Sequence, residues 1–134
     1  MAELTVKIIT PEKVIYEDTA SAVYAKSAEG EFGVLKGHIS YMTALDVGVA
    51  KIEKGKEVEY VAVMGGVFQV ADDHITILSD KAELGEDIDV TRAKSAKERA
   101  EARLKSAEGT DIDRAQFALI KALTRIKAAS RHGA

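Results

Sequence analysis

Short apolar segments separated by turn residues fill the first two thirds of the chain. They are rich in β-branched residues, and Thr5-Val6-Lys7-Ile8 and Lys51-Ile52-Glu53 alternate polar with apolar positions, as strands with one solvated face do. Segments of this length and spacing predict a compact all-β sandwich. The predicted strands are residues 4–10, 14–16, 21–26, 48–53, 57–64, 67–70 and 75–78.

The residues between these segments favour tight connections. Gly55 lies between two predicted strands, and Asp72-Asp73 lies between the next two, as expected for hairpin turns. Pro11 is the only proline and lacks a backbone N–H, so it should end the first strand.

The pattern changes near residue 87, where Ala, Lys, Arg and Glu replace the β-branched residues. This composition predicts two helices of about 18 residues each. Asp87 or Asp89 can cap the first helix, and Gly109 can end it in a left-handed turn. Thr110 and Asp113 are spaced almost as a capping box for the second helix. We therefore predict an α+β fold: a β-sandwich over residues 1–86, and then an antiparallel helical hairpin over 87–134, here called the arm.

Alanine dominates the expected contact between the two helices. Because alanine buries little apolar area, the hairpin should be only marginally stable. Phe117, Ile120 and Leu123 lie off this contact and need another surface, either the sandwich or a partner. The seam is predicted to contain Ala93, Ala96, Ala100, Leu104 and Ala107 from the first helix and Ala115, Leu119, Ala122, Ile126 and Ala129 from the second.

Charge divides at the same boundary. The arm holds 11 Lys or Arg and 7 Asp or Glu, a balance of +4, so the sandwich carries −7. These charges either form solvated faces or let the arm meet an acidic partner or an anion. The whole chain, at −3, gives no reason to expect a nucleic-acid partner.

Most catalytic and metal-binding patterns are missing from the sequence. Without cysteine the chain has no disulfide, thiolate metal site or cysteine nucleophile, and it contains no P-loop. His38, His74 and His132 are scattered, and the acidic clusters at Asp72-Asp73 and at 86–89 suit turns and caps. We therefore expect no self-contained enzyme. No apolar run could span a bilayer and no signal peptide is evident, so a cytoplasmic location is expected.

Three motifs, in order along the chain, are typical of one family. They are Gly30-Glu31-Phe32-Gly33-Val34-Leu35-Lys36-Gly37-His38, similar to GELGxLxGH with Phe32 in place of Leu, then Met64-Gly65-Gly66, and then Ile88-Asp89-Val90-Thr91-Arg92-Ala93. With the predicted architecture they make the whole chain resemble the epsilon subunit of bacterial F-type ATP synthase, and in particular the ATP-binding, Bacillus-like members.

The resemblance implies roles for the two glycine-rich motifs. Glu31 and His38 would lie at the end of the sandwich that faces the c-ring, and the sheet around Gly65-Gly66 would pack against the gamma subunit. Purely structural interpretations also hold at this point: the first motif could be a turn that needs glycine backbones, and Gly65-Gly66 could be a β-bulge.

The resemblance implies that the third motif binds ATP. The alternative is a purely structural role, in which Asp89 caps the helix and forms an ion pair with Arg92. Arg92 and Arg99 share one helix face, as do Lys121 and Arg125, so four cations could converge on a polyphosphate. Lys121 stands where ATP-binding members often carry Arg. Because lysine lacks the bidentate fork of arginine, this difference affects the affinity for ATP. The implied ATP-binding residues are Glu83, Ile88, Asp89, Arg92, Ala93, Arg99, Lys121 and Arg125.

The resemblance implies a non-catalytic rotor subunit, peripheral on the cytoplasmic face of the plasma membrane. Its partners would be the gamma, alpha and beta subunits and the c-ring. It would require no cofactor, with ATP as a regulatory ligand, with or without Mg²⁺. The arm would inhibit ATP hydrolysis by meeting acidic loops through Arg114, Lys121, Arg125, Lys127 and Arg131. A stand-alone ATP-sensing module and an oligomerisation scaffold are the alternatives.

Overall fold

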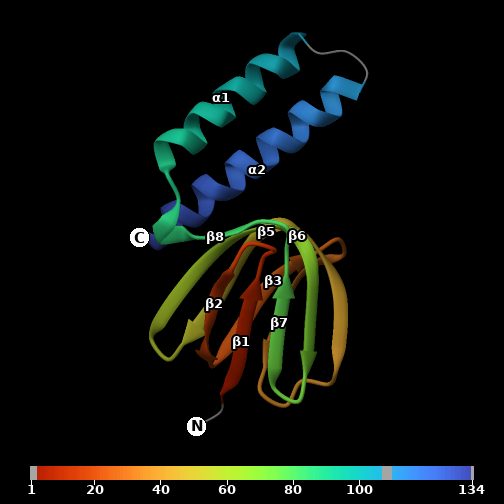
Figure 1. Cartoon of the computed structure of the whole chain (residues 1–134), viewed down its shortest axis with the longest axis vertical. Helices are drawn as coiled ribbons and strands as arrows, with labels where there is room; N and C mark the ends of the chain where they lie inside the picture. Colours follow the sequence, from red (N-terminus) through yellow and green to blue (C-terminus); the bar gives the residue numbers. More distant parts are fainter. Residues whose placement is uncertain (1–2, 107–109, 134) are drawn as a thin grey trace.

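The computed structural model describes residues 3–106 and 110–133, which form eight strands, a short 3-10 helix and two α-helices (Figure 1). The sheet order is β2-β1-β7-β6-β5-β3-β4, with β8 paired to β6. β1 and β7 run parallel, whereas the other neighbours run antiparallel. The elements are β1 (Leu4–Ile9), β2 (Val14–Ala20), β3 (Ala22–Ser27), β4 (Gly30–Leu35), β5 (Tyr41–Lys54), β6 (Glu57–Ala71), β7 (His74–Leu78), β8 (Ala82–Leu84), η1 (Gly85–Asp87), α1 (Val90–Ser106) and α2 (Thr110–His132).

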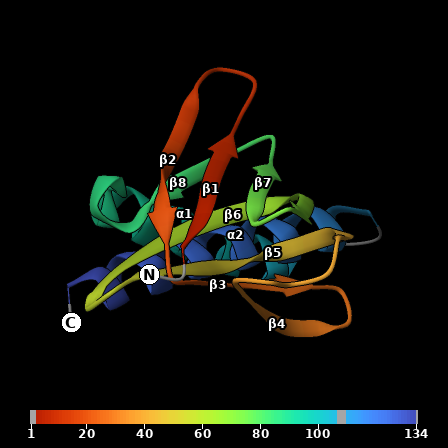
Figure 2. The same ribbon diagram turned by 90° about the horizontal axis from the view of Figure 1, so that it is seen from below.

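The sheet folds over on itself and encloses one apolar core. Figure 2 shows β1, β2 and β7 on one side and β3, β4 and β5 on the other. Every second residue of β1 (Leu4, Val6 and Ile8) is fully buried, as the alternating pattern predicts, and Phe68 is the largest buried side chain. The predicted fold class, a β-sandwich followed by two helices, is confirmed.

Two strands lie where the sequence predicted none, and several predicted segments are longer or joined. The glycine-rich motif at 30–38 is largely strand, because β4 pairs with β3. Gly30, the first residue of β4, has φ of 128°, and Gly37, two residues after its end, has φ of 86°. The segment predicted at 14–16 extends to Ala20 in β2, and the segment predicted at 48–53 is part of the longer β5. The two strands predicted at 57–64 and 67–70 are one continuous strand, β6. β8, just before the arm, was also missed, because three residues are too few to show a period.

Gly65 and Gly66 lie inside β6, and the β-bulge considered for them is wrong. The register between β5 and β6 is constant through this point, with Leu45 opposite Gly66 and Val47 opposite Met64. Both glycines have positive φ, and a Cβ on Gly66 would collide with the backbone carbonyl of Leu78. They mark the place where β6 changes partner from β8 to β7.

The predicted turns are confirmed. Gly55, with φ of 60°, connects β5 to β6, and Asp72 and Asp73, with φ of 49° and 62°, connect β6 to β7. Two successive positive φ values are typical of a type I′ hairpin turn. β1 ends at Ile9, two residues before Pro11.

The first helix of the arm is capped by Asp89. Its Oδ1 accepts a hydrogen bond from the backbone N–H of Arg92 at 3.0 Å, which satisfies one of the free donors of the first turn. Among the described residues no ion pair joins Asp89 to Arg92. α1 has 17 residues and α2 has 23, against about 18 predicted for each. The predicted helix end at Gly109, the seam residue Ala107 and the side chain of Thr110 lie outside the described residues.

α2 lies between α1 and the sandwich (Figure 1). Four seam alanines, Ala93, Ala100, Ala115 and Ala122, are buried as predicted. Ala129 does not belong to the seam: it packs, with the buried Ala128, in a cluster with the sandwich. α2 is the longer helix, and its last turns pack against β5 and β6. Within the described residues, no helix has an apolar stretch that could cross a bilayer.

Candidate functional site

A cavity of about 250 Å³ lies where the arm meets the sandwich. Three parts of the chain form it: the end of the sandwich through β8, the connection and first turns of α1, and the middle of α2. The cavity therefore exists only while the arm is folded against the sheet. It is lined by Lys81, Glu83, Asp87, Ile88, Asp89, Arg92, Ala93, Ala96 and Arg125.

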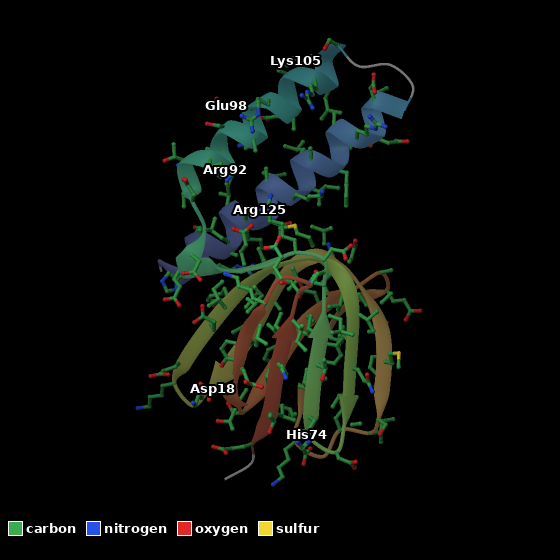
Figure 3. All side chains as sticks on the ribbon, in the orientation of Figure 1. Asp18, His74, Arg92, Glu98, Lys105 and Arg125 are labelled. Carbon is green, nitrogen blue, oxygen red and sulfur yellow. The ribbon has the colours of Figure 1, made fainter. Side chains whose placement is uncertain are left out.

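An ion pair joins α2 to the sandwich within this cavity. The Nε–H of Arg125 donates to Oε1 of Glu83 at 2.7 Å, and the two side chains are 20% and 28% exposed. A charge-assisted hydrogen bond with so little solvent contact is stronger than an ordinary surface pair. Figure 3 shows Arg125 on α2 close to Arg92 on α1. The wall of the cavity thus carries two guanidinium groups.

The start of α1 presents both polar and apolar groups to this cavity. Ile88 is buried and packs with Ala62 and Ala128 between sheet and arm. Ala93 is 4% exposed and lies one turn after Asp89, so its methyl faces the same space. The Ile-Asp-x-x-Arg-Ala spacing thus places an apolar floor, a helix cap and one cation together.

Six of the eight residues implied for ATP binding line this cavity, and two do not. Arg99 is exposed, two turns further along α1 than Arg92. The Nζ atom of Lys121 lies 4.3 Å from the centroid of the Phe117 ring. The two arginines Arg92 and Arg125 are therefore brought together as expected, but four cations do not converge. The six implied residues that line the cavity are Glu83, Ile88, Asp89, Arg92, Ala93 and Arg125.

Sequence reasoning missed three lining residues: Lys81, Asp87 and Ala96. Two of them carry a recognisable signal. Lys81 is two residues before Glu83 on an extended segment and so shares its face. Ala96 is one turn after Ala93 on the same helix face. Asp87 was considered as a cap, and it instead ends η1.

Glu31 and His38, which the resemblance places together at the end of the sandwich facing the c-ring, lie in different environments. Glu31 lines a second cavity of about 200 Å³ together with Leu123, Lys127 and Arg131 of α2. His38 follows Gly37, whose N–H donates to Oδ1 of Asp73 in the β6–β7 turn. That turn is at the end of the sandwich opposite the arm, where His74 is labelled in Figure 3. An extended strand separates the two residues because 30–35 is not a loop.

The basic residues implied for inhibition are spread along α2. Lys127 and Arg131 face the sandwich beside Lys26, and the guanidinium carbon of Arg131 lies 6.0 Å from the centroid of the Tyr60 ring. Arg114 is exposed near the start of the helix. In the folded arm, these cations therefore do not form one continuous surface.

The apolar residues that lie off the seam remain partly accessible. Phe117, Ile120 and Leu123 are 48%, 47% and 44% exposed. Ile120 and Leu123 border the cavity shared with β5, so the sandwich covers one side of them.

The last turn of α2 lies close to an acidic group of the sandwich. Burial raises the pKa of Glu59. The nearby charges of Glu86 and Asp87 raise this pKa further, whereas His132 lowers it. The buried Oε1 of Glu59 has no hydrogen-bond partner among the residues that the structure describes. Across residues 3–106 and 110–133, no cluster of three or more His, Asp or Glu residues could hold a metal ion.

Family models match nearly the whole chain. Residues 3–85 match the beta-sandwich domain of the ATP synthase delta/epsilon chain, and residues 86–130 match its long alpha-helix domain. The chain belongs to the ATP synthase delta/epsilon family. Two ATP synthase epsilon chains are closely similar over their full length: that of Shouchella clausii is 47% identical over 100% of both chains, and that of Halalkalibacterium halodurans is 45% identical over 98% of this chain and 100% of its own.

Solved structures agree with this assignment. A chain of the Euglena gracilis mitochondrial ATP synthase, solved as OSCP/F1/c-ring, superposes with a TM-score of 0.83 at 25% identity, covering 96% of this chain and 82% of that one. A chain from the Tetrahymena thermophila central stalk and c-ring shares the fold, with a TM-score of 0.54 at 17% identity, covering 98% and 96%. The chain is thus an epsilon-type component of an F-type ATP synthase. A subunit of such a complex is favoured over a stand-alone sensor or a scaffold.

Proposed function

We propose that this chain is a non-catalytic regulatory subunit of the rotor, which links gamma to the c-ring through the sandwich and inhibits ATP hydrolysis through the arm. The separation of the two parts supports this. The main core contains residues up to Ala82, with Leu84 packed against it, and the arm adds a small second cluster around Ile88 and Ala128. The sandwich can therefore keep its contacts while the arm moves. Its location would be peripheral, on the cytoplasmic face of the plasma membrane.

The regulatory ligand of the arm is ATP, in our proposal. The supporting observation is the cavity that holds Arg92 and Arg125 together between sheet, α1 and α2. A ligand bound there contacts the folded arm and loses its site when the arm leaves. At 100 times its dissociation constant such a ligand adds about 2.7 kcal/mol to the folded state. ATP therefore holds the arm down, and falling ATP releases it.

The released arm reaches the catalytic alpha and beta subunits. The 23-residue α2 is about 35 Å long at 1.5 Å per residue. Release frees Lys127 and Arg131 from the sandwich and Arg125 from Glu83, so that these cations, together with Arg114 and Lys121, become available to acidic loops of a partner.

The decisive experiment compares reconstituted complexes that contain the full chain with complexes that contain residues 1–86. We expect ATP hydrolysis to be faster without the arm at low ATP and similar at high ATP. Calorimetry of the isolated chain should detect ATP binding in the wild type and weaker binding in Arg92→Ala. Equal hydrolysis rates with and without the arm would contradict the inhibitory role. An absence of binding heat at millimolar ATP would contradict the ligand.

A further inference from the structure

Lys81 occupies a place in the cavity that Arg99 and Lys121 do not. It lines the 250 Å³ cavity together with Arg92 and Arg125. It also lines a neighbouring cavity of about 390 Å³, which shares Glu83 and Asp87 with the first. Lys81 is therefore at the junction of the two spaces.

The backbone holds Lys81 in this place. Its carbonyl oxygen accepts hydrogen bonds from the N–H of Met64 at 3.0 Å and from the hydroxyl of Ser79 at 2.9 Å. The next residue, Ala82, is buried in the core. Because neighbours alternate along an extended segment, Lys81 then lies on the outer face with Glu83. A fixed main chain beside a flexible, exposed ammonium group suits an anion that arrives from solvent.

Two of the carboxylates that line the cavity already have partners, whereas the ammonium group of Lys81 has none among the described residues. Glu83 is paired with Arg125, and Asp89 uses an oxygen to cap α1. Within the described residues, no ion pair involves Lys81 or Arg92. These two cations are thus the ones that can meet phosphate oxygens without first losing a carboxylate partner.

The size of the cavity places the phosphates near Lys81. Pockets for small ligands typically have 300 to 1,000 Å³, so a nucleotide exceeds the 250 Å³ space and must extend into the adjoining one. The adjoining cavity is lined by the apolar Val14 and Ile15 and by the carboxylates of Glu12 and Asp80, so it suits the base rather than the phosphates. The phosphates then lie in the smaller cavity, where Lys81 stands with Arg92 and Arg125.

We propose that Lys81 is a phosphate-binding residue of this site and supplies, together with Arg92, the positive charge that distinguishes a nucleoside triphosphate from a nucleoside. The inference rests on the proposed binding of ATP. Lysine acts here as a point charge, so removing it lowers affinity for the phosphates and leaves contacts to the base intact.

The test is calorimetry with ATP and with adenosine on the full chain at two salt concentrations. Lys81→Gln should weaken ATP binding about five-fold, leave adenosine binding unchanged and reduce the salt dependence, whereas Lys81→Arg should keep wild-type affinity. Lys56→Gln, an exposed lysine in the β5–β6 turn, is the control with the same charge change.

The outcomes separate the two proposals. If the wild type binds ATP and Lys81→Gln binds it as well as Lys56→Gln does, the role of Lys81 is wrong and the ATP site stands. An equal loss of ATP and adenosine binding in Lys81→Gln would also overturn the phosphate role. If the wild type binds no ATP, both proposals fail together.

Discussion

Arg125 and Glu83 connect the arm to the sandwich, since the guanidinium Nε of α2 lies 2.7 Å from the carboxylate of β8. The two residues are 42 positions apart in the chain and form the shortest of the ion pairs in the described residues. A folded arm places them together, and a released arm separates them. The pair is therefore a direct test of arm docking.

Glu83→Gln should weaken docking of the arm by about 1 to 3 kcal/mol, because it leaves the mostly buried Arg125 without its partner charge. Hydrogen exchange of α2 amides should accelerate, while exchange in β1 stays slow. Asp18→Asn, which breaks the exposed pair with Lys54, is the control and should leave α2 exchange unchanged. Equal exchange in Glu83→Gln and wild type would contradict the role of this pair.

Gly85→Ala should also release the arm, for a steric reason. A Cβ at this position would lie 2.7 Å from the carbonyl oxygen of Ala128 and 3.2 Å from that of Tyr60. Overpacking of this kind typically costs about 1 to 3 kcal/mol. Gly133→Ala, where a Cβ would make ordinary contacts, is the matched control. Proteolysis within the arm should be faster in the first variant alone.

A chain that ends at Glu86 should fold on its own. The main core contains no described residue after Leu84, so truncation removes only the small cluster around Ile88 and Ala128. The truncated protein should unfold in one cooperative transition with the near-ultraviolet spectrum of a packed core. A broad, non-cooperative transition would show that the sandwich needs the arm.

Glu59→Gln should stabilise the protein at pH 7. Burial and the carboxylates of Glu86 and Asp87 raise the folded-state pKa of Glu59. The contribution of this side chain to folding stability is therefore complete below pH 4.5, its ordinary pKa, and is lost as the pH rises through the folded-state pKa. The gain should be at most about 1 kcal/mol, since the side chain is partly solvated, and should vanish at pH 4. Glu57→Gln, exposed on the same strand, is the control, and a gain independent of pH would contradict this origin.

Glu31→Ala and His38→Ala should separate into two phenotypes. Glu31 lies beside Lys26, Lys127 and Arg131, so its removal leaves like charges facing each other and should weaken docking of the arm. Because His38 lies near the β6–β7 turn, at the far end from the arm, His38→Ala should leave docking of the arm unchanged. Exchange of α2 amides measures the first effect, and proton pumping by the assembled complex measures coupling. Identical α2 exchange in both variants would rule out the contact at Glu31.

Strands, turns and helices were predictable where the local pattern was strong. Alternation in β1, the glycine and aspartate turns, and the change of composition at residue 87 determined the fold class. The sequence left Asp87 and Asp89 as candidate caps of the first helix, and the structure decided for Asp89. The pattern failed at β4 and at Gly65-Gly66. There, glycines that suggest a turn or a bulge from the sequence lie within or at the ends of paired strands, and hydrogen bonds to neighbouring strands decide the outcome.

The site was determined only in part by the sequence, because helix periodicity fixes which residues share a face but not what that face meets. Spacing grouped Arg92 with Arg99 and Lys121 with Arg125, yet the packing of the two helices on the sandwich left one member of each pair at the cavity. The same packing brought Arg125 to Glu83, Glu31 to Arg131, and Lys81 to the cavity of Arg92. Contacts between elements distant in sequence depend on how the helices pack on the sheet, and this packing is a property of the tertiary structure alone.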